Sequence, residues 1–190
     1  MRSGALQQGR ALTILWQALS ARFDSAALRA FDWPPKPAPA WPGVRAWCLG
    51  GSLDAPLALA WHEPGALSFA RAAALALELD GSVLLHQGGS SLERLLLRAR
   101  VKWQDLHPGA LHLATAIWDC GYVGREPQAL AALARFEPRR PTFIVLQDFD
   151  ADALTNAVQC LRVYSQRFRW PVRVLILGHT ASPDLVHIPA

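Results

Sequence analysis

Cysteine is scarce in this chain, and its scarcity limits the chemistry to be expected. The 190 residues include only three cysteines, which are widely spaced and form no CxxC pair: Cys48, Cys120 and Cys160. An odd number of scattered cysteines argues against a disulfide framework. We therefore expect a reducing, cytoplasmic compartment in which each cysteine serves as a small core residue.

Charged residues and long apolar runs are also few. Charged residues make up 18% of the chain, and no apolar run approaches the ~18 residues of a transmembrane helix. Hydrophobic residues reach 52% and tryptophans number eight, which fits either a large core or a surface that meets partner proteins. The net charge of +4 is compatible with an anionic partner or with an ordinary basic surface.

Motifs of hydrolytic catalysis are missing. The six histidines are scattered, and neither an H-E-x-x-H nor a G-x-S-x-G pattern occurs. Cys120 follows Asp119, but no nearby residue marks a histidine partner for a nucleophile. We expect no catalytic residue, no resident metal and no cofactor.

The N-terminal part differs in composition from the rest of the chain. Apolar residues at helical spacing predict an amphipathic helix over 11–31, with a cleaved signal peptide as the alternative. Five prolines follow within the next twelve residues and predict an extended linker. We therefore divide the chain into an arm, residues 1–43, and a main domain, residues 44–190.

Short apolar runs alternate with helical patterns throughout the main domain. The runs lie at 44–49, 57–61, 83–86, 111–116, 142–147 and 172–177. Helical patterns lie at 67–79, at 126–137, from Asp150 or Asp152 to about Arg169, and after Ser90, which forms a capping box with Glu93. This alternation predicts a soluble three-layer α/β domain with a mostly parallel sheet. Ligand sites of such sheets lie at the carboxyl ends of the strands.

One segment resembles a phosphate loop that has lost its function. A working loop, G-x-x-x-x-G-K-[ST], wraps phosphates with backbone amides and neutralises them with lysine. The matching stretch here supplies Gly50, Gly51 and Ser52 but no lysine, and Asp54 would repel a phosphate. We therefore predict a degenerate loop, with a non-catalytic nucleotide pocket as the alternative.

Two strand ends carry polar residues of interest. The apolar strand TFIVLQ ends at Asp148, and Asp150 follows two residues later, so these carboxylates predict either an acidic metal site or the cap of the next helix. His179 follows the last apolar strand and predicts either a phosphate sensor or a solvent-facing turn.

Arginines gather in three groups along the chain. The groups are Arg94, Arg98 and Arg100, with Lys102 beside them; Arg135, Arg139 and Arg140; and Arg162, Arg167, Arg169 and Arg173. Such groups can bind nucleic acid, although no nucleic-acid-binding motif accompanies them and a solvated face is the alternative.

From Ala66 to Thr180 the expected order of elements resembles the RecA/KaiC-like P-loop superfamily. Within it, the stretch is similar to the N-terminal, NTPase-like domain of the bacterial cellulose-biosynthesis protein BcsE. The likeness is carried by SVLLHQGGSSLERLL, HPGALHLATA, PTFIVLQDFDADALTNAVQCLRVYSQRF and VRVLILGHT. The resemblance implies an ATPase-like fold without a catalytic loop, in a cytoplasmic accessory protein that docks on secretion components at the inner membrane.

Three functions are consistent with these patterns. The first is a catalytically inactive RecA-like scaffold or regulator that assembles with partner proteins, or with copies of itself, in cellulose or exopolysaccharide secretion. The second is a divergent nucleotide hydrolase that uses Asp148 and Asp150 with magnesium. The third is a RecA-like DNA-binding regulator, related to SOS-type proteins, that acts through its arginines.

Overall fold

A computed structural model describes residues 27–31, 38–50, 55–80, 95, 96, 99, 113, 116–178 and 185–189 of the chain. Its centre is a five-stranded sheet in the order β2-β3-β4-β1-β5, and every neighbouring pair of strands is parallel. The strands are β1 (Leu57–His62), β2 (Asp119–Tyr122), β3 (Thr142–Gln147), β4 (Val172–Leu177) and β5 (Val186–His187). This sheet confirms the predicted α/β class with a parallel sheet.

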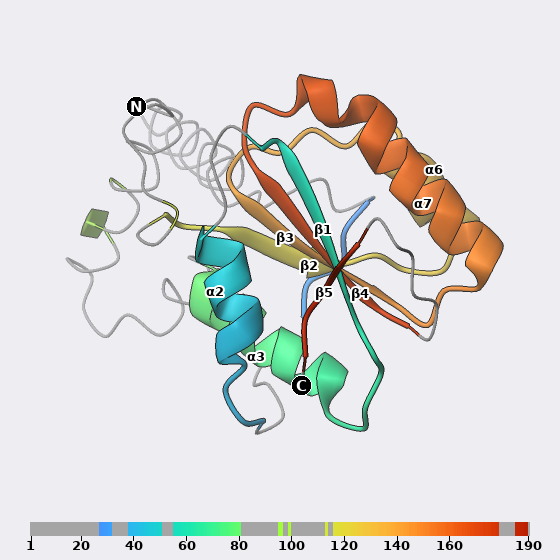
Figure 1. Cartoon of the computed structure of the whole chain (residues 1–190). Helices are drawn as coiled ribbons and strands as arrows, with labels where there is room; N and C mark the ends of the chain where they lie inside the picture. Colours follow the sequence, from blue (N-terminus) through green and yellow to red (C-terminus); the bar gives the residue numbers. More distant parts are fainter. Residues whose placement is uncertain are drawn as a thin grey trace, which may run out of the picture.

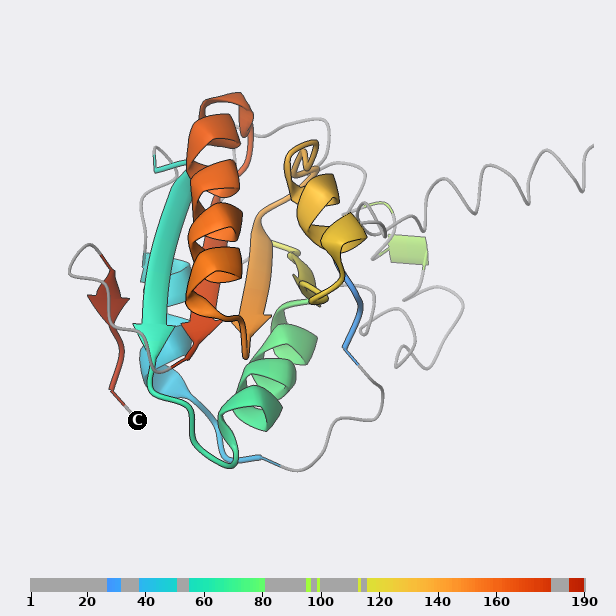
Figure 2. The same ribbon diagram turned by 90° about the vertical axis from the view of Figure 1, so that its right-hand side faces the viewer.

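Helices cover both faces of the sheet, as Figure 1 shows. The helices are α2 (Pro42–Gly50), α3 (Ser68–Leu79), α6 (Pro127–Leu133) and α7 (Ala151–Tyr164), with the short 3₁₀ helix η2 (Ser165–Arg167) after α7. α2 and α3 lie on one face, and α6 and α7 lie side by side on the other (Figures 1 and 2). This arrangement is compatible with the predicted three layers.

The two faces of the sheet form two separate cores because side chains alternate along a strand. In β3, Phe143 and Val145 pack with α2 and α3, while Ile144 and Leu146 pack with α6 and α7. All six residues of β4 are buried. Burial on both faces explains why β3 and β4 are rich in apolar residues without polar alternation, although β4 also buries one charged residue, Arg173.

The helices begin close to the predicted positions, but α6 ends at Leu133 instead of near 137, and α7 ends at Tyr164 instead of near 169. Proline starts α6 at its first turn, where the missing amide hydrogen has no helical partner to lose. α7 begins after Asp150, and it ends at Tyr164, where the 3₁₀ turn η2 replaces the last predicted turn. The predictions for β1, α3, β3 and β4 are confirmed, with bounds that agree within one residue.

Two local predictions are wrong. The run at 44–49 is not a strand but lies in α2, where Val44 and Cys48 are buried four residues apart on one helix face. Residues 27–31 do not continue the predicted N-terminal helix, because Arg29 forms an antiparallel bridge with Tyr122 at the outer edge of β2. In both places a contact with the sheet outweighs a local pattern that suits another structure.

Several predicted segments lie wholly or mostly outside the described residues. These are the first part of the N-terminal helix, the strand at 83–86, the helix after Ser90 and the strand at 111–116. The division of the chain at residue 43 stays a prediction. Pro42 and Gly43, which the prediction assigns to the linker, form the first turn of α2.

Candidate functional site

The carboxyl ends of the strands define the edge where a site is expected. β1 leads into α3 on one face of the sheet, whereas β2 and β3 lead into α6 and α7 on the other. The connection after β1 and the connections after β2 and β3 therefore leave the sheet on opposite faces. In open parallel sheets, such a change of face leaves a crevice at the strand ends.

An open cleft of about 650 Å³ lies at the end of β1. Its size lies within the range of small-molecule sites. The walls come from the β1–α3 connection, from the segment before α2 and from the segment around β5. The lining residues are Pro39, His62, Glu63, Pro64, Gly65, Ala66, Leu67, Ser68, Arg71, His187 and Pro189.

His62, the last residue of β1, fixes one wall of this cleft. Its Nδ1 lies 2.8 Å from the backbone oxygen of Ile188, so this nitrogen carries the proton and donates. The Trp41 ring meets the imidazole edge-on, with the ring centroids 4.6 Å apart. These contacts join β1, the segment after β5 and the start of α2, and they keep the ring of His62 buried.

The connection from β1 to α3 forms the floor of the cleft. The amide of Gly65 donates to Oγ of Ser68 at 2.8 Å, and the amide of Ser68 donates to the carbonyl of Gly65 at 3.1 Å. Gly65 and Ser68 therefore bond to each other, and their two amide hydrogens are not available to a ligand. No residue of the connection is a lysine, and Glu63 adds a negative charge.

Arg71 lies one turn further along α3 and also lines the cleft. Its guanidinium carbon lies 5.5 Å from the centroid of the Trp41 ring, at a distance typical of a cation–π contact. Its Nε is buried and has no hydrogen-bond partner in the described part of the chain.

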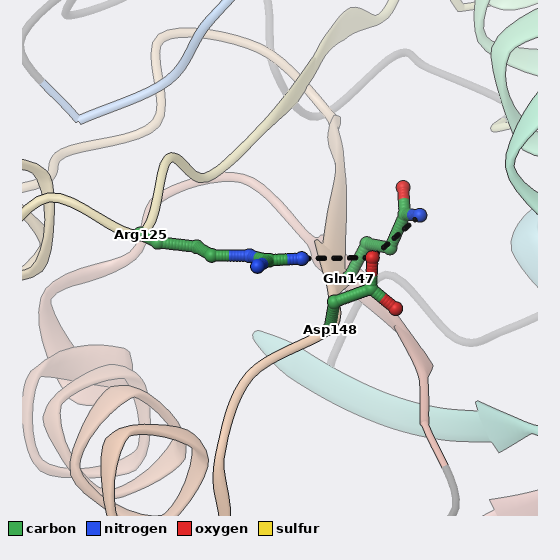
Figure 3. Close-up of polar contacts among 3 residues, drawn as sticks. All are labelled: Arg125, Gln147 and Asp148. Carbon is green, nitrogen blue, oxygen red and sulfur yellow. Dashed lines mark hydrogen bonds and ion pairs between the residues drawn. The ribbon is translucent and has the colours of Figure 1, made fainter.

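A second polar group lies at the end of β3 (Figure 3). One carboxylate oxygen of Asp148 accepts from Arg125 at 2.8 Å and from Nε2 of Gln147 at 3.0 Å. Asp148 has a φ of 54°, in the left-handed region that only glycine, asparagine and aspartate adopt readily. Both partners of the ion pair are about half exposed, so solvent screens their attraction.

Asp150 and Asp148 have different hydrogen-bond partners. The side chain of Asp150 accepts the amide of Ala153 at 2.7 Å and caps α7. Capping, one of the two predicted roles, is therefore observed. Within the residues that the structure describes, no group of three histidine, cysteine or acidic side chains is placed to hold a metal ion.

The predicted phosphate loop does not follow a strand. Gly50 ends α2, and Gly51, Ser52 and Asp54 lie outside the described residues, so no contact tests their role. His179 lies outside them as well. The strand-to-helix connection that a phosphate loop would occupy runs from the end of β1 into α3.

The buried cysteines have no access to a substrate in this structure. Burial raises the pKa of Cys48 to about 12, although the nearby Arg173 opposes the shift. Burial also raises the pKa of Cys120, and the neighbouring Asp80 and Asp119 add to the effect. Both thiols therefore stay protonated and unreactive at neutral pH.

The site residues that the sequence did not single out are His62, Glu63, Arg71 and Arg125. Arg125 and Asp148 are 23 residues apart, and only the pairing of β2 with β3 brings them together. His62 could have been found as the last residue of an apolar run, by the same logic that singled out Asp148.

Comparisons with protein-family models, with curated proteins and with solved structures gave no significant match. No helix in the described ranges is long and apolar enough to span a membrane.

Proposed function

We propose that this protein is a RecA-like scaffold or regulatory protein that assembles with partner proteins and does not hydrolyse nucleotide. The observation that carries the proposal is the connection between β1 and α3, His62-Glu63-Pro64-Gly65-Ala66-Leu67-Ser68. It stands where a P-loop fold holds its phosphates, it has no lysine, and its Gly65 and Ser68 amides bond within the connection itself.

The electrostatics of this connection oppose a triphosphate. A phosphate loop works because several amides and a lysine converge on the β- and γ-phosphates. Here the Gly65 amide is taken by Ser68, Pro64 has no amide hydrogen, and the side chain of Glu63 is negative. Each of these features weakens a polyanion site, so the connection supports loss of hydrolysis.

The end of β3 supports the same conclusion. An aspartate that coordinates magnesium needs its oxygens free for metal or water. In this chain one oxygen of Asp148 already accepts from Arg125 and Gln147, and Asp150 is occupied as a helix cap. A divergent hydrolase that uses this pair would have only one oxygen of each carboxylate left for magnesium.

The resemblance to the NTPase-like domain of BcsE suggests the setting of such a scaffold. We place the protein in the cytoplasm, at the inner membrane, as an accessory of a cellulose or exopolysaccharide secretion system. The apolar-rich composition is consistent with a surface that partners cover, whereas Trp41, Trp118 and Trp170 are buried within the protein itself.

Two measurements test the proposal together. Phosphate release and thermal unfolding are recorded with millimolar ATP or GTP and magnesium, and we expect neither turnover nor stabilisation. A ligand in large excess over its Kd must raise the melting temperature, so a clear shift with saturable turnover would establish the hydrolase instead.

The scaffold role itself is tested by assembly. The tagged protein is captured from its host, each captured protein is purified, and the complex is rebuilt and sized by light scattering. We expect a defined complex with a secretion component. A protein that remains a monomer and rebuilds no complex would refute the proposal.

A further inference from the structure

Arg71 is a cation without a counter-ion in the described part of the chain. Ion pairs join other arginines to acids, including Arg29 to Glu126, Arg45 to Glu78 and Arg125 to Asp148. Arg71 takes part in none, and its contact is with the face of Trp41. A half-buried guanidinium left in this way is an open binding position for an anion.

The Arg71 side chain is held in place before any ligand arrives. Its backbone amide donates to the carbonyl of Leu67 at 2.8 Å, so the residue belongs to the first turns of α3. Trp41 is itself buried and fixed against His62. A guanidinium fixed by stacking loses little side-chain entropy on binding, which favours affinity.

Beside the charge of Arg71, the cleft has apolar walls against which the uncharged part of a ligand can pack. Pro39, Pro64, Leu67 and Pro189 line its walls. The first turn of α3 contains no acidic residue, so the positive end of the helix dipole adds to the field of Arg71. Glu63 also lines the cleft and reduces the net positive charge, which disfavours a polyanion.

We propose that the cleft at the end of β1 binds a ligand with one carboxylate on an apolar body, with Arg71 as the counter-ion. A single fixed guanidinium matches a single carboxylate in a two-point hydrogen bond. The volume of about 650 Å³ leaves room for an aromatic or aliphatic group against the prolines. This inference does not rest on the scaffold proposal.

The test uses the whole protein with benzoate as the probe and amide NMR as the readout. Benzoate is titrated to about 10 mM, the range in which a small ligand of modest affinity binds. We expect saturable shifts of the amides of residues 65–68. Benzyl alcohol, which has the same body without the charge, should shift them at least about tenfold less at equal concentration. ATP should bind no more tightly than benzoate.

Variants assign the binding to Arg71. Arg71→Met should abolish the benzoate shifts, and Arg71→Lys should retain weakened binding, because lysine keeps the charge but not the planar fork. Arg45→Met, which removes an exposed arginine from α2 outside the cleft, should bind as the parent does. Glu63→Gln should tighten binding, because it removes a negative charge from the cleft.

Circular dichroism melting of each variant confirms that it is folded, and Arg71→Lys provides a second test should Arg71→Met unfold. The inference is overturned if benzoate moves no amide of the β1–α3 connection. It is equally overturned if a folded Arg71 variant binds benzoate as tightly as the parent, or if benzyl alcohol binds as well as benzoate.

Discussion

Gly121 offers a sharp test of how the N-terminal segment is attached to the sheet. It lies in the middle of β2, and a Cβ added there would stand 2.8 Å from the backbone oxygen of Arg29 and 3.1 Å from Cβ of Leu28. Real Cβ atoms do not approach backbone oxygen so closely. Gly121→Ala must therefore push residues 27–31 away from β2.

The size of the effect follows from what this segment contributes. Arg29 and Tyr122 exchange two backbone hydrogen bonds of 2.8 and 2.9 Å, together worth about 2 kcal/mol. Leu28 is buried, and partial loss of its packing adds about 1 kcal/mol. Alanine offsets about 1 kcal/mol by restricting the unfolded chain. We expect Gly121→Ala to lower the free energy of unfolding by about 2 kcal/mol.

The assay is equilibrium denaturation in urea together with hydrogen exchange. The amides of Arg29 and Tyr122 should lose protection in Gly121→Ala, while those of β4 keep theirs. Gly178→Ala is the matched control, because the nearest atom to its added Cβ is 3.9 Å away. Equal stability of the two variants, or unchanged protection of Arg29, would show that the close approach has no energetic consequence.

Substitutions at four further positions test other parts of the structure. Asp150→Ala removes the cap of α7 and should cost about 1 kcal/mol in urea denaturation, and an unchanged midpoint would contradict the cap. Leu133→Ala opens a cavity in the core under α6 and should cost about 2–5 kcal/mol by the same assay, whereas a loss below about 1 kcal/mol would mean a loosely packed core. Asp148→Val should be about 2 kcal/mol less stable than Asp148→Gly, because glycine accepts a φ of 54° without strain and a β-branched residue does not, and equal stability would disprove that conformation. The pKa of the Cys48 thiol is higher in the folded than in the unfolded chain, so its stabilising contribution is complete below pH 9 and is lost between pH 9 and about 12. Cys48→Ala should therefore reduce the fall in the free energy of unfolding over this pH range, and an unchanged fall would refute the assignment.

The sequence predicted the centre of the sheet well because burial there is complete on both faces. TFIVLQ and VRVLIL are six-residue stretches dominated by apolar residues, and each corresponds to one strand, β3 or β4. The helices α3, α6 and α7 were predicted because helix formers, a proline at the first turn and a capping aspartate mark their ends.

The parts that the sequence did not predict depend on long-range contacts. β2 consists of Asp119-Cys120-Gly121-Tyr122, which contains no β-branched residue, and it is a strand because it pairs with β3 on one side and Arg29 on the other. α2 is short and apolar enough to resemble a strand. The spacing of Val44 and Cys48 was a helical signal that the strand assignment passed over.

The candidate cleft was predicted only in its general location. The rule that sites lie at strand ends applies to it, but of the described residues singled out from the sequence only Asp148 directly follows a strand, β3. Gly50 ends a helix, and Asp148 and Asp150 have separate partners. Arg71 could not be singled out, because an arginine in a helical pattern has no special signal until a fold places it beside Trp41.

The Arg29 bridge has a consequence for self-association of the chain. It occupies the outer edge of β2, while β5 at the opposite end of the sheet has no further strand beside it in the described residues. A sheet with both ends open could add copies without limit, as fibrils do. Because Arg29 already bonds to Tyr122, a second copy could pair with this edge of β2 only by displacing the segment at 27–31.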